Sequence, residues 1–316
     1  MFNRSFLFLR SFILPLVLVS FLLTGCKEEV TSPEEYHSDQ LVLQQMVLED
    51  SSNSSFEAAF NDGDPMGYFS KELTNVYPIR IGRRITTASR TINSTVLTDT
   101  AYVTATYNFT GNFFLVASYD SAAVGDTTAI DTTIVKPFSS VVVRKLIFAK
   151  VANTRNPRLN WRLIAVSLPD GGTVTNNLKI NKLSVYLPNG DSIIVTSPSD
   201  YYLNKFPGMR RQIPVISRNQ SVTVKLEVFS AYDVDDLVVL TFGADPLGRN
   251  RQKVRFSLVS SEPATGGYNK VYEHTFRPTQ AAGYYHALMD VMSNGSIFTD
   301  NQPFENKVWG MPYIVR

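Results

Sequence analysis

The chain has one cysteine and three histidines in 316 residues, so we expect no Cys/His zinc cluster. Charged residues make up only 18% of the chain and the net charge is +2, which excludes a strongly basic nucleic-acid binder and an acidic disordered chain. A glycine-rich phosphate loop and a Gly-x-Ser-x-Gly nucleophile motif are also absent. The sequence therefore predicts no metal, no cofactor and no nucleic-acid partner.

The residues that are abundant favour a β-rich protein. Hydrophobic residues form 44% of the chain and include 20 phenylalanines and 15 tyrosines, with many runs of Val, Thr and Ile. These side chains are typical of strands. Residues 26–316 are long enough to form two hydrophobic cores.

The N-terminus has the three parts of an export signal. The first ten residues carry two arginines and no acid, residues 11–23 are apolar, and Leu23-Thr24-Gly25-Cys26 follows. An apolar core this short is typical of a secretory signal rather than a membrane-spanning helix. The four closing residues resemble the bacterial lipobox, which implies cleavage before Cys26 and attachment of lipid to its thiol. A plain signal peptide with a chance cysteine, or a short signal-anchor helix, is the alternative.

The predicted location follows from this resemblance. Lys27, Glu28 and Glu29 resemble the signal that directs lipoproteins of Bacteroidetes-like bacteria to the outer face of the outer membrane. A solvated charged tether is the alternative interpretation. We expect a lipid-anchored outer-membrane protein that contacts the membrane through Cys26, with the periplasmic or cell-surface face left open.

Periodicity predicts helices followed by strands up to residue 170. Ser32-Pro33-Glu34-Glu35 begins one helix and Ser54-Ser55-Phe56-Glu57 begins another. Alternating apolar residues then predict four long strands, at residues 85–96, 102–116, 135–151 and 161–168. This order predicts an α+β cone, in which helices cover a curved antiparallel meander. It resembles the nuclear-transport-factor-like cone that ketosteroid isomerases and scytalone dehydratases share.

The stretch Pro169-Asp170-Gly171-Gly172-Thr173 is the predicted domain boundary, and no helical signal is expected beyond it. Eight segments predict short strands, at 178–187, 192–196, 222–229, 236–242, 253–260, 270–276, 284–292 and 308–316. Their number suggests an all-β sandwich of the immunoglobulin or fibronectin type. The stretch from Ala281 to Ala287 resembles the tyrosine corner of immunoglobulin domains, with Tyr285 as the corner residue. Because Ala287 occupies the cysteine position, no inter-sheet disulfide is expected.

The predicted organisation has five parts along the chain. These are a signal peptide over 1–25, an acylated tether over 26–31, the α+β cone over 32–170, a linker over 171–177, and the immunoglobulin-like sandwich over 178–316.

Few residues qualify as acid–base catalysts. The carboxylates of residues 73–170 all fall in predicted turns, namely Asp99, Asp120, Asp126, Asp131 and Asp170, and that range has no histidine. A catalytic acid or base needs a protected cleft, which turns rarely provide. The helices offer His37, Glu49 and Glu57 as the remaining candidates. In the sandwich, His274 is expected to be partly buried, His286 to point away from the core, and Asp233, Asp235 and Asp236 to form a turn rather than a calcium loop. We therefore predict no catalytic residue.

Charge is unevenly distributed along the chain. Residues 27–72 hold eleven acids and two bases, whereas residues 73–316 hold 26 bases and 17 acids. Ten of these bases lie in the predicted first sheet: Arg80, Arg83, Arg84, Arg90, Arg144, Lys145, Lys150, Arg155, Arg158 and Arg162. We expect the acidic helices to lie on the basic sheet; binding of anionic glycans or lipid headgroups is the alternative.

Three functions remain open. The leading hypothesis is a non-enzymatic, lipid-anchored envelope protein that binds a partner or takes part in assembly. A second is a surface glycan-binding lipoprotein that uses exposed aromatic side chains such as Tyr201, Tyr202, Tyr268 and Tyr272. A third is an isomerase, dehydratase or hydrolase with its site in the cone.

Overall fold

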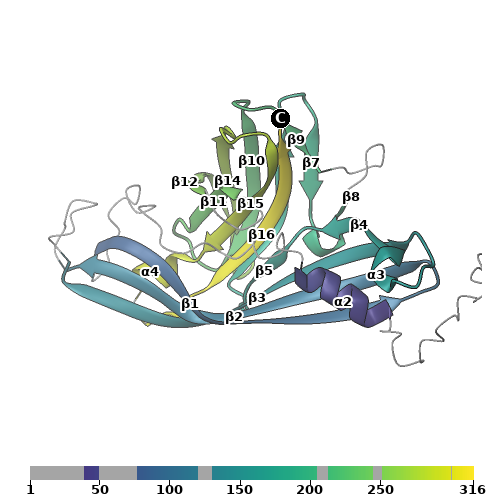
Figure 1. The fold of residues 1–316 in the computed structure, drawn as a ribbon. Helices are drawn as coiled ribbons and strands as arrows, with labels where there is room; N and C mark the ends of the chain where they lie inside the picture. Colours follow the sequence, from purple (N-terminus) through teal and green to yellow (C-terminus); the bar gives the residue numbers. More distant parts are fainter. Residues whose placement is uncertain (1–38, 50–76, 120–129, 205–212, 245–250, 300) are drawn as a thin grey trace, which may run out of the picture. The chain divides into compact units, whose positions relative to one another are not determined.

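The computed structural model describes residues 39–49, 77–119, 130–204, 213–244, 251–299 and 301–316. These residues form two sheets and a few short helical segments (Figure 1). The helical segments are α2 (Asp39–Glu49), α3 (Pro157–Asn160), the 3-10 turn η5 (Pro198–Asp200) and α4 (Asn294–Phe298).

The larger sheet has eleven strands, eight of which form a continuous hydrogen-bonded path. In spatial order, this path runs through β1 (Tyr77–Val96), β2 (Thr100–Ser118), β3 (Thr132–Lys150), β5 (Asp170–Thr173), β16 (Asn306–Val315), β15 (Gly283–Met292), β11 (Leu237–Ala244) and β12 (Gln252–Arg255). Off this path, β4 (Trp161–Ser167) pairs with β3, β8 (Tyr202–Asn204) with β4, and β9 (Val215–Ile216) with β16.

The smaller sheet has five antiparallel strands. Its order is β13 (Ser257–Ala264), β14 (Gly267–Phe276), β10 (Val222–Ser230), β6 (Leu178–Tyr186) and β7 (Ser192–Val195). Val222, Val224, Leu226 and Val228 of β10 are all buried, which confirms the inward face predicted from their alternation.

The first three strands form the predicted antiparallel meander. β2 pairs with β1 on one side and with β3 on the other, over almost its whole length. Val103, Ala105, Tyr107 and Phe109 are buried while their neighbours are more exposed, as the period-two pattern predicts. The helix predicted to begin at residues 32–35 is present in its described part as α2, which buries Leu43 and Val47; its predicted start lies outside the described residues. The second predicted helix, which starts at residue 54, lies outside the described residues.

One face of β2 contributes to two hydrophobic clusters. Alternate residues from 101 to 109 belong to the main core. This core also contains side chains from α2, from other strands of the larger sheet, and from the central strands β6, β10 and β14 of the smaller sheet. Farther along the same face, Phe113 and Leu115 belong to a second cluster with side chains of β11, β15 and α4, including Leu237, Met292 and Ile297. Strands β11 and β15 of the larger sheet therefore pack against β1 and β2 of the same sheet.

The fold-class prediction of an α+β cone is wrong. Within the described part of residues 32–170, the helices are α2 and the four-residue α3, and these do not form a helical layer over the sheet. Instead β3 pairs with β5, and β5 pairs with β16, so the meander continues into strands from the C-terminal half. The apolar face that a cone would cover with helices is covered here by other strands and by α2.

The segment predicted as the 171–177 linker begins inside strand β5. An added Cβ at Gly171 would lie 2.3 Å from the carbonyl oxygen of Val141 in β3, and one at Gly172 would lie 2.3 Å from that of Asn306 in β16. The two glycines therefore let β5 fit between two longer strands. Residues 38–316 also form a single compact unit by their contacts.

Seven of the eight strands predicted beyond residue 177 are present, and the arrangement is β-rich and sandwich-like. The predicted strand 253–260 is instead divided between β12 and β13, which belong to different sheets. The strands beyond residue 177 do not form a separate immunoglobulin domain, because β11, β15 and β16 belong to the larger sheet together with the meander. The corner hydrogen bond is present: the Tyr285 hydroxyl donates to the Ala281 carbonyl oxygen at 2.9 Å. Ala287, Met289 and Val291 are buried in the main core, as predicted.

Candidate functional site

The predicted lipid-attachment residue, Cys26, lies outside the described residues, as do His37, Glu57, Asp120 and Asp126. In the described ranges, no helix is both long enough and apolar enough to span a membrane.

The described carboxylates of the first sheet differ in their surroundings. Asp99 and Glu49 are exposed, and Glu49 pairs with Arg158. Asp131 accepts hydrogen bonds from the Ser118 hydroxyl at 2.7 Å and the Tyr119 amide at 2.8 Å, which lower its pKa. Asp170 was predicted in a turn but begins strand β5, where burial raises its pKa and the Trp309 indole donates to it at 3.0 Å.

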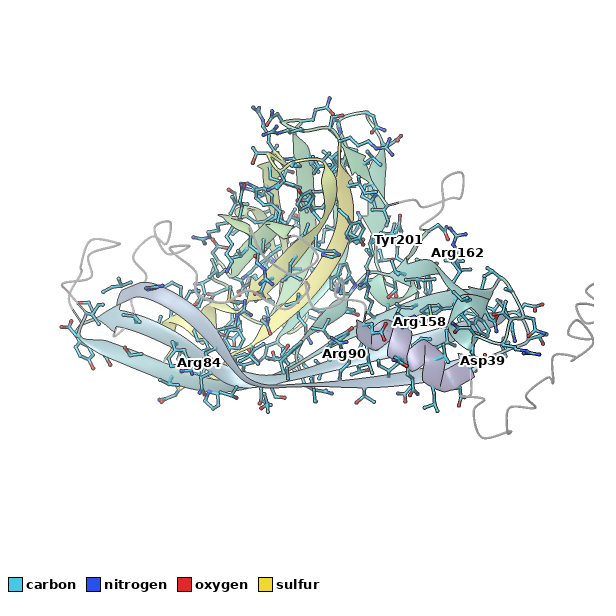
Figure 2. All side chains as sticks on the ribbon, viewed as in Figure 1. Asp39, Arg84, Arg90, Arg158, Arg162 and Tyr201 are labelled. Carbon is cyan, nitrogen blue, oxygen red and sulfur yellow. The ribbon has the colours of Figure 1, made fainter. Side chains whose placement is uncertain are left out.

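Most of the basic side chains of the first sheet have protein partners. Around α2, Lys150 pairs with Asp39 at 3.4 Å, Arg158 pairs with Glu49, and Arg90 donates to the Leu48 carbonyl oxygen at 3.1 Å (Figure 2). The Arg90 guanidinium also lies 4.7 Å from the centroid of the Tyr107 ring. The predicted attraction between the acidic helix and the basic sheet is confirmed for α2.

Two ion pairs lie beside β11, β12 and β14, and one of them is fully buried. Lys270 and Asp236 are 2.8 Å apart and neither side chain is exposed. Asp235 pairs with Arg255 at 2.6 Å, so these aspartates serve the packing of β11, β12 and β14. Among the residues that the structure describes, no group of three or more His, Cys, Asp or Glu is placed to hold a metal ion.

A second buried pair joins the beginning and the end of the larger sheet. Arg83 of β1 pairs with Asp290 of β15, and Asn306 of β16 donates to the same carboxylate at 2.9 Å. Two cavities of about 10 and 20 Å³ border Arg83, which is space for about one water molecule each. Lys253 lines the first of them, and burial lowers its pKa to about 8 despite the opposing charge of Asp290.

The histidines of β14 and β15 are placed within packed surroundings. His274 is half-buried, with its ring 6.1 Å from that of Phe256, and burial lowers its pKa. His286 was predicted to point away from the core, and it lies on the opposite face from Ala287, yet it is buried against Tyr284. The reason is that consecutive residues of β15 are all buried from position 286 to 292, so both faces of the strand are covered there.

The predicted row of exposed tyrosines does not form. Tyr272 is completely buried, and its hydroxyl accepts a hydrogen bond from the Asp236 amide at 3.0 Å. Tyr201, Tyr202 and Tyr268 are half-buried. The alternation of residues in the sequence predicts which side chains share a face of β14 with Tyr272. It does not show that the Tyr272 hydroxyl has a buried hydrogen-bond partner.

An open hollow of about 540 Å³ lies where the smaller sheet meets strand β16 and the loop after β5. Its wall includes three asparagines, two lysines and one aromatic ring: Asn176, Lys179, Asn181, Phe229, Asn269 and Lys307. Among the described residues, the side chains that line it include no carboxylate and no imidazole. The arrangement offers hydrogen bonds, positive charge and a flat apolar ring, but no acid–base pair.

No protein-family model and no curated protein matches this chain.

The sequence pattern does not predict a site at the residues of the hollow. It predicts a linker at Asn176 and an ordinary strand at Lys179 and Asn181. The available signal was the density of amides and lysine in residues 176–181, Asn-Asn-Leu-Lys-Ile-Asn. That composition is equally typical of a surface turn, and the contributions of Phe229, Asn269 and Lys307 come from strands far away in the sequence.

Proposed function

We propose that the protein is a lipid-anchored, non-enzymatic binding protein of the bacterial outer membrane. Anchoring would occur through Cys26, and an envelope glycan or protein would be engaged by the soluble part. Support for the anchor comes from the charged start, the apolar run and Leu23-Thr24-Gly25-Cys26. Two or more acyl chains give durable attachment, because each buried CH₂ contributes about 0.8 kcal/mol.

Support for binding rather than catalysis comes mainly from the hollow. It is large enough for a small ligand or for a segment of a larger one, and its lining is polar and basic. General acid–base chemistry needs a titratable group placed against the substrate. Asp236 and Asp290 are buried carboxylates of the kind that could act as an acid or base, but they are paired with Lys270 and Arg83, respectively.

The anchor is tested by replacing Cys26 in the full chain. Wild-type protein should fractionate with outer membranes and incorporate labelled palmitate, whereas Cys26→Ser should be unlabelled and retain its signal peptide. Thr24→Ser, which keeps a small residue in the same motif, is the matched control and should behave as wild type. A processed, acylated Cys26→Ser protein would refute the lipid-anchor proposal.

A further inference from the structure

We infer that the hollow between β6, β10, β14 and β16 binds an acidic oligosaccharide, one that carries carboxylates on pyranose rings. This inference rests on the proposed binding function and specifies the ligand class of the same site. It is carried by the geometry of six side chains: Asn176, Lys179, Asn181, Phe229, Asn269 and Lys307.

Three of these side chains form a row across neighbouring strands. Phe229 of β10 is directly opposite Lys179 of β6 on one side and Asn269 of β14 on the other. Directly opposed residues project from the same face of a sheet, and neighbouring strands lie about 4.8 Å apart. The row therefore spans about 10 Å, a length comparable to a disaccharide, with the aromatic ring at its centre.

The backbone at Gly267 lies close to the ring of Phe229. A Cβ added at Gly267 would lie 3.0 Å from Cζ of Phe229 and 2.3 Å from the carbonyl oxygen of Ser230. The glycine thus leaves room for the ring at the edge of the hollow. An aromatic ring in a polar site can cover the apolar face of a sugar ring while surrounding polar groups bond to its hydroxyls.

A β-bulge places the second asparagine. The pairing between β10 and β6 passes from Glu227 opposite Lys182 to Val228 opposite Ile180, so Asn181 is the extra residue. Bulges commonly redirect one side chain, and here Asn181 lines the hollow. Together with Asn176 and Asn269, it supplies amide groups that both donate and accept hydrogen bonds, as sugar hydroxyls require.

The charge of the lining favours an acidic sugar over a neutral one. Lys179 is exposed, and Lys307 enters from the larger sheet with its Nζ 2.8 Å from the Thr173 carbonyl oxygen. A nearby carboxylate, Glu305, is buried and accepts hydrogen bonds from Thr175 and Asn177 at 2.6 and 2.8 Å. A carboxylated ligand would therefore meet ammonium groups at the wall of the hollow itself, where charge-assisted hydrogen bonds are stronger than neutral ones.

The test is calorimetric titration of the detergent-solubilised full chain with hexagalacturonate, cellohexaose and inorganic phosphate. We expect saturable binding of hexagalacturonate, at least tenfold tighter than cellohexaose or phosphate. Lys179→Gln and Phe229→Ala should each weaken it at least fivefold. Lys225→Gln is the matched control, since Lys225 lies on β10 four residues before Phe229 and does not line the hollow; the affinity of this variant should stay within twofold of wild type.

Each contrary result has a distinct meaning. Equal affinity for cellohexaose overturns the acidic ligand, and equal affinity for phosphate overturns the carbohydrate. If Lys225→Gln weakens binding as much as Lys179→Gln does, the ligand does not bind in this hollow. The absence of saturable hexagalacturonate binding also overturns the assignment. The membrane fractionation of Cys26→Ser is read out independently, so failure of the ligand assignment is separable from failure of the proposed anchored function.

Discussion

Single residues show how the interior accommodates charge. Lys136 is buried, and its ammonium donates to the carbonyl oxygens of Ser296 and Thr299, at 2.7 and 2.6 Å, where α4 ends. A cation at the C-terminal end of a helix satisfies carbonyl groups that lack helical partners. Lys270 and Arg83 have carboxylate partners instead. In each case the charged group is buried only together with groups that replace its hydration.

Removal of one member of a buried pair should be costly. Lys270→Met leaves the carboxylate of Asp236 in an apolar interior, and we expect the free energy of unfolding to fall by about 3–5 kcal/mol. The matched control is Lys182→Met, because Lys182 also lies 2.8 Å from its partner Glu227 but the two side chains are 35% and 41% exposed. That change should cost about 0–1 kcal/mol in urea titrations. Similar losses for both variants would contradict the assigned role of burial.

Lys253 should make stability depend on pH. Its pKa of about 8 in the folded protein lies below the value of about 10.4 for a lysine in an unfolded chain. Between these values the unfolded chain binds more protons, so this residue contributes stability that increases as the pH rises from about 8 to about 10.5.

The measurement is urea unfolding at several pH values across that window. Lys253→Met should lose the part of the increase that Lys253 supplies, whereas Lys179→Met, at an exposed position, should retain it. An unchanged slope in Lys253→Met would show that this lysine does not titrate as its burial implies.

Among the structural elements, the four-residue strand β5 has the most constrained position. Gly171→Ala would place a Cβ 2.3 Å from the Val141 carbonyl oxygen and 2.8 Å from Cα of Val142, both of them backbone atoms. We expect a loss of at least about 2 kcal/mol, because the neighbouring strands would have to separate. Gly82→Ala, also in a strand but with nothing within 4 Å of the added Cβ, should change stability by no more than about 0.5 kcal/mol. Thermal unfolding of the two variants checks the difference.

Sequence periodicity predicted individual strands well and their partners poorly. The alternation around Tyr107 and Val224 is a local property, so the strands and their inward faces could be predicted from it. Which strands become neighbours depends on contacts between distant residues, such as Trp309 opposite Asp170. The pair Gly171-Gly172 was therefore interpreted as a linker, although it is a close approach between strands. The hollow was missed for the same reason, since its lining comes from four separate regions of the chain.

At the scale of the whole molecule, the predicted halves share a core. Trp161 of β4 and Trp309 of β16 are the two tryptophans of the chain; both are buried, and both belong to the main cluster. Arg83 and Asp290 connect the same two halves at the second cluster. Cooperative unfolding is expected when one core contains side chains from all parts of a structure.

The two tryptophans allow this cooperativity to be measured. Trp161→Phe leaves a fluorescent reporter in the C-terminal half, and Trp309→Phe leaves one in the N-terminal half. In each variant we expect the fluorescence transition in urea to coincide with the loss of sheet measured by circular dichroism. Separate midpoints within either variant would mean that the regions before and after residues 171–177 unfold independently.

The central place of β16 has a kinetic consequence. The hairpins β1–β2 and β2–β3 join residues that are close along the chain, so they can form early. β16, by contrast, is the last strand in sequence, yet it pairs with β15, β5 and β9, and Asn306 bonds to Thr173 from 133 positions away. Until it docks, the meander and the C-terminal strands each retain an unpaired edge, which is the kind of intermediate that binds chaperones or aggregates. Its insertion should be the slow step of folding, and in pulsed hydrogen exchange the amides of β16 should become protected after those of β2.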